Sequence, residues 1–139
     1  MRLLSIGLLL VAVCGCTTPY RPASRFTRVG YSDVQLDEHV YRVSFVGNDQ
    51  TPAAQTRDYA MLRAAEITLS AGYQYFAVLK DVSDENLCAA ATEDSVYTVR
   101  QPITHLTVQC FKQKPEEGLS FNAEVLYDSV RAQYGIASS

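Results

Sequence analysis

The hydrophobic pattern of the chain begins with an almost continuous apolar segment, Leu3 to Val13, which only Ser5 and Gly7 interrupt. Arg2 places a positive charge directly before it. A helix of this length rises about 16 Å, roughly half the thickness of the hydrocarbon core of a bilayer. The segment is therefore too short to span a membrane in the mature protein, and it is typical of the apolar region of a secretory signal peptide.

Further along the chain, apolar positions alternate with polar ones and then change to a helical spacing. His39 to Val46 has the period of two that predicts a half-buried strand, with three side chains on its apolar face: Tyr41, Val43 and Phe45. A helix is predicted to begin at Thr51 as the N-cap, to continue through Pro52 to Ala71, and to end at Gly72. Its apolar face is expected to contain Leu62, Ala65 and Leu69.

The second half of the chain predicts further strands around an acidic segment. Tyr73 to Leu79 is a nearly continuous apolar run, typical of a buried strand, and Asp81 to Asp94 is interpreted as an acid-rich loop. Val96 to Val99 is predicted to be an edge strand because Pro102 soon follows it. His105 to Phe111 alternates again, with inward side chains expected at Leu106, Val108 and Cys110.

The last predicted element is a helix that stops at Gly135, with apolar positions at Ala123, Leu126, Tyr127, Val130 and Tyr134. The order β-α-β-(β)-β-α predicts an α+β fold, a small mixed sheet of three to four strands with two helices packed on one face. The first helix is expected to join parallel strands, and the later strands to return antiparallel. Residues 30–139 are expected to form this single domain.

Composition narrows the classes of function. With 47% hydrophobic and 19% charged residues among 139, the chain is long and apolar enough for one folded domain. Twelve Lys and Arg against 15 Asp and Glu give a net charge of −3 without a basic run, so no nucleic-acid partner is expected. The sequence contains no Gly-rich phosphate loop and no His-Glu-x-x-His motif, so it predicts no cofactor and no metal site.

The segment Val13-Cys14-Gly15-Cys16 resembles the bacterial lipobox, in which an aliphatic residue and two small residues precede the cysteine to be lipidated. The resemblance implies diacylglycerol transfer to Cys16, cleavage between Gly15 and Cys16, and acylation, for example with palmitate, of the new N-terminus. Thr17 in the following position implies sorting to the outer membrane, with the domain facing the periplasm. An uncleaved N-terminal helix and a secreted protein without lipid are the alternatives.

Residues 16–29 contain prolines and small polar residues without periodicity, and are interpreted as a flexible tether after the lipidated cysteine. Downstream, two motifs resemble an uncharacterised family of small proteobacterial lipoproteins: Asp37-Glu38-x-x-Tyr41-x-Val43-x-Phe45-x-Gly47-Asn48 and Arg63-Ala64-Ala65-Glu66-x-Thr68-Leu69-x-x-Gly72-Tyr73-x-Tyr75-Phe76. The similarity covers residues 28–80 and the lipobox. It supports the lipoprotein prediction and implies no activity.

Two cysteines remain after Cys14 is removed and Cys16 is lipidated, namely Cys88 and Cys110. The oxidising environment of an exported protein favours a disulfide between them, which would contribute about 3 kcal/mol by closing a loop of this length. Two separate buried thiols are the alternative. A zinc site formed with His105 is disfavoured because the usual ligand spacing is absent.

Other candidate residues have ordinary structural explanations. Glu66 is expected to form an ion pair with Arg63 or Arg42 rather than to act as a catalytic acid. A hydrolase triad needs a serine, an acid and a histidine, and these types occur at Ser32, Asp33 and His39. The Gly-x-Ser-x-Gly turn that usually surrounds such a serine is absent, so a triad is not expected. The acidic segment lacks the spacing of a calcium loop. Tyr41, Tyr73 and Tyr75 are expected to pack against core residues rather than to form a stacking surface for a glycan or peptide.

The sequence therefore predicts a lipid-anchored envelope protein without catalytic residues, whose domain is a binding or interaction module for an envelope partner. An exposed apolar or tyrosine-rich patch would favour the hypothesis of a binding module. The alternatives are an envelope-stress or redox sensor that uses Cys88 and Cys110, and a hydrolytic enzyme with a pocket where polar groups converge.

Overall fold

The computed structural model of the chain describes residues 17–137, apart from the side chains at positions 86, 88 and 90. The predicted signal peptide 1–15, its predicted cleavage site and the predicted lipidation site Cys16 lie outside the described residues. The elements follow in the order β1 (Gly30–Asp37), β2 (Val40–Val46), α1 (Ala53–Ser70), β3 (Tyr75–Ala91), β4 (Val96–Phe111), β5 (Phe121–Asn122) and α2 (Ala123–Tyr134).

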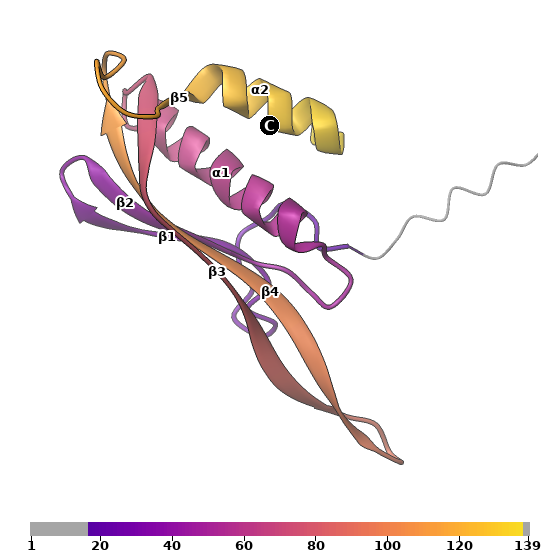
Figure 1. Cartoon of the computed structure of the whole chain (residues 1–139). Coiled ribbons are helices and arrows are strands. Elements are labelled where there is room, and N and C mark those ends of the chain that lie inside the picture. Colours follow the sequence, from indigo (N-terminus) through magenta and orange to yellow (C-terminus); the bar gives the residue numbers. More distant parts are fainter. Residues whose placement is uncertain (1–16, 138–139) are drawn as a thin grey trace, which may run out of the picture.

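The fold is α+β, as predicted, but its sheet has five strands in the order β1-β2-β4-β3-β5, and every neighbouring pair is antiparallel. The prediction of three to four strands in a mixed sheet was therefore wrong. Because β2 and β3 both run antiparallel to β4, they run parallel to each other. Helix α1 thus connects two parallel strands, as expected, with β4 inserted between them (Figure 1).

Strand β1 was not predicted, because its sequence shows little alternation of apolar and polar residues. It lies at the edge of the sheet, where β2 is the only one of the named strands that it pairs with, and most of its residues are exposed. An edge strand that buries almost no side chains does not need alternating hydrophobicity. Strand β5 contains only two residues and pairs with Tyr75 and Phe76 of β3, which is too short for a sequence pattern.

The predicted acidic loop, Asp81 to Asp94, is largely strand. Strand β3 continues through it to Ala91, and the two separate strands predicted beyond it are one strand, β4. We call the part of this hairpin from Glu85 to Gln101 the arm. Its two strands pair only with each other, because pairing between β2 and β4 ends at Ile103. The arm extends away from the rest of the domain (Figure 1).

Pro102 lies inside β4 because no strand partner needs its missing N–H. Its carbonyl accepts a 2.9 Å hydrogen bond from the N–H of Gly47, just after β2 ends. The N–H and carbonyl of one residue in a strand point the same way, so the missing donor also faces the end of β2. Pro102 therefore marks the place where β4 leaves the three-stranded region and enters the arm.

Helix α1 ends as predicted and begins differently. Gly72 follows it with φ of +87°, the left-handed conformation that glycine adopts at low cost. Its N-cap is Pro52, without a side-chain cap. The Thr51 hydroxyl donates a 2.8 Å hydrogen bond to the side chain of Asn48, so the predicted N-cap role of Thr51 was wrong.

Helix α2 has a regular beginning and end. The Asn122 side chain accepts a hydrogen bond from the N–H of Val125, and Gly135 follows the helix with φ of +63°. The helix packs mainly against α1 and β5, so it forms a third layer above α1 (Figure 1). The expectation that both helices rest on the sheet is corrected, because only α1 makes extensive contact with the central strands. Tyr134 donates a 2.5 Å hydrogen bond to Asp58 of α1 and fixes the two helices together.

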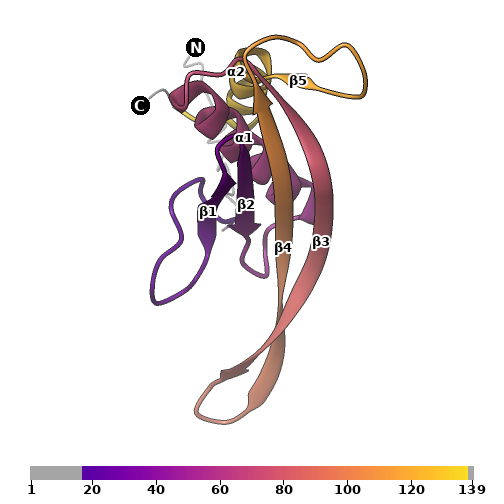
Figure 2. The same ribbon diagram turned by 90° about the vertical axis from the view of Figure 1, so that its left-hand side faces the viewer.

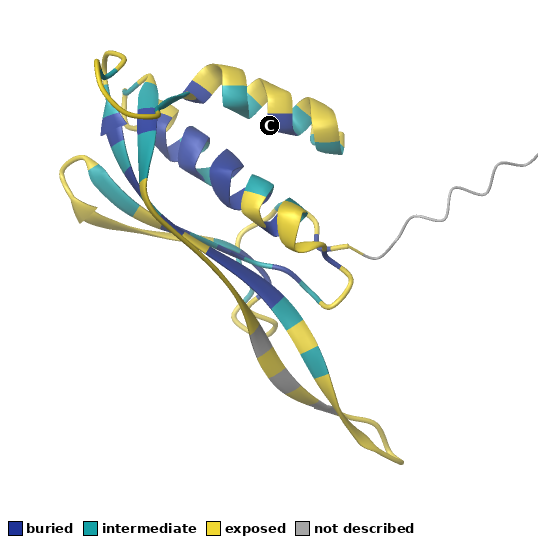
Figure 3. Ribbon diagram, in the orientation of Figure 1, coloured by how far each residue is buried: buried dark blue, intermediate teal, exposed yellow. Residues whose placement is uncertain are grey.

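The hydrophobic core lies between α1 and one face of the sheet (Figure 3). Most of the predicted inward side chains of β2, β4 and α1 are buried, namely Val43, Phe45, Leu62, Ala65, Leu106, Val108 and Cys110. Tyr41 is half-buried, and Leu69 lies at the exposed border of the helix. Within residues 17–137, no helix covers the other face of the sheet, which Figure 2 shows in front of both helices.

Residues 18–23 pack against the domain, contrary to the predicted flexible tether. Thr18 is buried, its N–H donates to the Thr51 hydroxyl at 3.0 Å, and its own hydroxyl accepts from the N–H of Asn48 at 2.7 Å. Two backbone hydrogen bonds connect residues 21–23 to Tyr31. Gly30 permits this close approach, because a Cβ there would lie 2.4 Å from the carbonyl oxygen of Arg21. The folded unit therefore begins at about residue 18.

Candidate functional site

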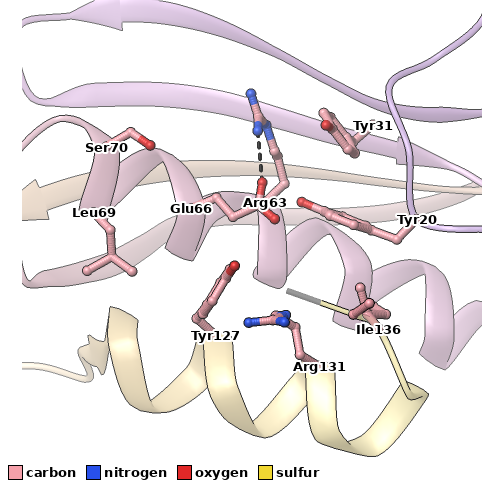
Figure 4. Close-up of a pocket in the computed structure, with 10 residues that line it drawn as sticks. Tyr20, Tyr31, Arg63, Glu66, Leu69, Ser70, Tyr127, Arg131 and Ile136 are labelled. Atoms are coloured by element: carbon pink, nitrogen blue, oxygen red, sulfur yellow. Dashed lines mark hydrogen bonds and ion pairs between the residues drawn. The ribbon is translucent and has the colours of Figure 1, made fainter. Parts of the chain in front are cut away.

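A cleft of about 560 Å³ lies between α1, α2 and the docked N-terminal segment (Figure 4). Its size is in the range of ligand pockets. The two helices and β1 supply most of its walls, and the residues that line it are Tyr20, Tyr31, Arg63, Glu66, Leu69, Ser70, Tyr127, Arg131, Ile136 and Ala137. Charged groups and tyrosine rings dominate this lining, which suits a ligand with both polar and planar parts.

Arg63 of α1 is the central charged group of the cleft. Its guanidinium donates to Asp33 at 2.8 Å and to Glu66 at 2.9 Å, and it lies 4.4 Å from the centre of the Tyr31 ring. Burial alone would lower the pKa of Arg63, but the hydrogen bonds to Asp33 and Glu66 outweigh it and raise the pKa. The predicted ion pair of Glu66 with Arg63 is therefore confirmed.

Tyr20 forms the inner wall of the cleft. Its ring packs against those of Tyr31 and Tyr59, with centroids 4.8 and 5.4 Å apart. Its buried hydroxyl has no partner in hydrogen-bonding geometry within residues 17–137. Burial, followed by the negative charge of Glu66, raises the pKa of Tyr20, so the hydroxyl keeps its proton. A buried phenol with its proton intact is a donor. The Glu66 carboxylate is an acceptor close enough to raise the pKa of Tyr20 further, so an acceptor group of a ligand would compete with Glu66 for this proton.

Helix α2 supplies the opposite wall. The Arg131 guanidinium lies 4.7 Å from the centre of the Tyr127 ring, and the Tyr127 hydroxyl points toward Arg63 and Glu66 (Figure 4). Two guanidinium groups, one carboxylate and three phenols therefore line one space. The residues that line the cleft include no His, the most common general base in enzymes, and no Cys, a strong nucleophile. The arrangement is suited to binding a ligand by hydrogen bonds and ring contacts.

The candidate hydrolase residues do not form a triad. Asp33 points toward α1 and binds Arg63. Ser32 is its neighbour in β1, so its side chain lies on the opposite face of the sheet. His39 lies in the turn before β2, where its Nδ1 contacts the Tyr73 hydroxyl. The alternative partner considered for Glu66, Arg42, also lies on the uncovered face.

The predicted disulfide does not fit this fold. Cys110 carries a free, buried thiol that lies 3.4 Å from the Thr68 hydroxyl, and burial raises the pKa of Cys110. The side chain of Cys88 lies outside the described residues, but its backbone pairs with Val99. Val99 and Cys110 are eleven residues apart on β4, or about 36 Å along an extended strand. A disulfide requires Cα atoms within about 7 Å, so this cysteine pair is no basis for a redox sensor.

The acidic residues of the predicted loop do not converge either. Asp81 pairs with Arg57 at 2.8 Å, and Glu85 pairs with Arg100 at 3.7 Å. Among the side chains that the structure describes, which exclude that of Cys88, no group of three His, Cys, Asp or Glu is arranged to hold a metal ion. Tyr41 and Tyr73 pack against the core, as predicted.

Sequence reasoning missed the tyrosines that line the cleft. Tyr20 belongs to the segment that was interpreted as a tether, and Tyr127 was counted only among the apolar positions of the last helix. Two signals were available in the sequence. Tyr20 is an aromatic residue between two prolines, and Gly30 lacks the side chain that would prevent this segment from docking.

No helix within residues 17–137 is long and apolar enough to cross a membrane. No known family model matches the chain, and no curated protein or solved structure is detectably similar to it.

Proposed function

We propose that the protein is a lipid-anchored envelope lipoprotein whose domain binds a ligand or a partner segment in the cleft between α1 and α2. Cys16 carries the diacylglycerol, and the domain faces the periplasm from the outer membrane. The domain acts by binding, without catalysis. The convergence of Tyr20, Arg63 and Arg131 on one cleft of ligand size carries the proposal.

Docking of the N-terminal segment supports a closely held anchor. Thr18 is fixed by Asn48 and Thr51, and only Thr17 separates it from Cys16. Two residues span at most about 7 Å, so the acylated cysteine holds this end of the domain directly at the lipid surface. The arm begins near the same place, because Gly47 binds Pro102 at its base. The anchor therefore orients the domain, whereas a long tether would let it rotate freely.

The anchor is tested by the intact mass of the protein extracted from membranes. We expect a chain that begins at Cys16 and carries acyl groups. The matched control is Cys16→Ser, which we expect to lack the acyl mass and to retain the leader. A wild-type mass without acyl groups would contradict the lipoprotein proposal.

The cleft is tested by a photoreactive amino acid placed at Tyr127, which lines it, and separately at Val125. Val125 lies on the same helix, is exposed and does not line the cleft. We expect a discrete adduct in cells from position 127 and none from position 125. Equal crosslinking at both positions, or none at either, would contradict a binding role for the cleft and would leave the lipid anchor unaffected.

A further inference from the structure

A second hollow lies on the face of the sheet that α1 and α2 do not cover. Figure 2 shows this face, with strands β2, β4 and β3 in front of the helices. Its volume is about 310 Å³, and its lining consists of Arg42, Lys80, Val82, His105 and Thr107. Strands β2, β4 and β3 supply these side chains. The floor is therefore the hydrogen-bonded centre of the sheet, which is a rigid platform for a site.

The strand register explains why these side chains meet. Thr107 of β4 pairs with Arg42 of β2 on one side and with Lys80 of β3 on the other. His105 is two residues away on β4, so it lies on the same face. Its Nδ1 is hydrogen-bonded to the Ser44 hydroxyl at 2.6 Å, which orients the ring. Two cations, a hydroxyl and an imidazole thus surround one space.

The two cations of this hollow are not engaged in ion pairs with any residue that the structure describes. Arg57, Arg63 and Arg100 each form an ion pair with an acid, whereas Arg42 and Lys80 form none with the residues that the structure describes. Their strands are separated only by β4, so their backbones lie about 10 Å apart and their long side chains can reach a common anion. Like charges on one sheet face repel, and a bound anion removes that cost.

We propose that this hollow binds the phosphate group of a phosphate-bearing ligand. The Arg42 guanidinium binds phosphate oxygens in bidentate fashion, and the Lys80 ammonium neutralises the second negative charge. The Thr107 hydroxyl and the His105 ring supply further hydrogen bonds. The net charge of the chain is −3, so this positive site is local and does not belong to a generally basic surface. The inference is independent of the cleft and of the proposed lipid anchor.

Binding is tested by calorimetric titration of the membrane-purified protein with pyrophosphate at low ionic strength. We expect the double variant R42A/K80A to bind roughly 10- to 100-fold more weakly than the wild type. The control R100A/K112A removes the same charge elsewhere and should retain wild-type affinity. Urea unfolding midpoints should match in all three proteins, because each altered side chain is exposed.

Equal weakening in both double variants, or no binding by the wild type, would overturn the proposal. The source of the phosphate is distinguished by repeating the titration in phosphatidylcholine proteoliposomes with and without phosphatidylglycerol. Competition by the anionic lipid assigns the hollow to a lipid headgroup. An affinity that the lipid does not change assigns it to a free phosphate compound.

Discussion

The β3–β4 hairpin contains two regions that belong to one ladder, which has a register shift between Val78 and Lys80, and these regions have different surroundings. In the body of the domain, this hairpin lies between β2 and β5 and beneath α1, and the side chains of Phe76, Leu106 and Val108 are fully buried. In the arm, the same two strands continue without another strand beside them, and Leu87 and Val96 are 67% and 75% exposed. Figure 3 shows this change from blue to yellow along the hairpin.

The comparison shows that hydrogen-bonded pairing alone does not bury side chains. Both regions satisfy their inward backbone groups, but only the body has a third strand and a helix to exclude water. Two-stranded ribbons are marginally stable by themselves. We therefore expect stability to be concentrated in the body and the arm to open locally at low cost.

The largest expected effect is the loss of stability when a buried leucine of the body, rather than an exposed leucine of the arm, is replaced by alanine. Leu106→Ala should reduce the free energy of unfolding by about 2–5 kcal/mol, because it leaves a cavity between α1 and the sheet. Leu87→Ala in the arm should change it by less than about 0.5 kcal/mol. Urea denaturation followed by circular dichroism measures both. Equal losses would show that the arm is packed as tightly as the body.

The next effect concerns the reactivity of the Cys110 thiol, which lies in the body of the domain. In the Cys88→Ser background, maleimide should label Cys110 roughly 100-fold more slowly in the folded protein than in urea, because labelling requires an opening that exposes the core. Burial also raises the pKa of Cys110, which lowers the thiolate fraction. The intact mass of the wild type should be the same with and without reductant. A 2 Da gain on reduction would restore the disulfide and contradict this fold.

A pH dependence distinguishes a buried tyrosine from an exposed one. Burial raises the pKa of Tyr20, so above pH of about 10 the unfolded chain loses this proton and the folded chain keeps it. Stability should therefore fall as pH rises, with a slope of at most about 1.4 kcal/mol per pH unit from this residue. Tyr20→Phe should flatten the slope between about pH 10 and 12 and change little at neutral pH, where it removes an unpartnered hydroxyl.

Tyr97→Phe in the arm is the matched control for this alkaline measurement, since half of the Tyr97 side chain is exposed. We expect its slope to equal that of the wild type. Identical slopes for the wild type and Tyr20→Phe would show that Tyr20 is not held in the domain, and the docked N-terminal segment would then be in doubt.

The smallest expected effect is that of shortening the arm. Residues 89–98 are replaced by Asn-Gly, which joins the paired residues Cys88 and Val99 by a tight hairpin turn. The free energy of unfolding should change by less than about 1 kcal/mol, because no described side chain of the deleted segment is buried. A larger loss in thermal or urea denaturation would show that the arm supports the body.

Much of the secondary structure could be predicted because its signals are local. The alternation around Val43 and Phe45, the helical spacing of α2 and the stops at Gly72 and Gly135 are properties of neighbouring residues. The ion pair of Glu66 with Arg63 was also predictable, since the two lie one turn apart on the same helix face. Both cavities escaped prediction because each combines residues from elements distant in the chain.

The sequence by itself determined the order of most elements, the core-facing side chains and the α+β class, because hydrophobic period and turn residues act over a few positions. Only the tertiary structure decided that Asp81 to Ala91 is strand, since pairing with β4 overrides its polar composition. Tertiary contacts likewise docked Tyr20 in the cleft and separated Cys88 from Cys110. Strand register and long-range hydrogen bonds set these placements, and neither is encoded in the spacing of nearby residues.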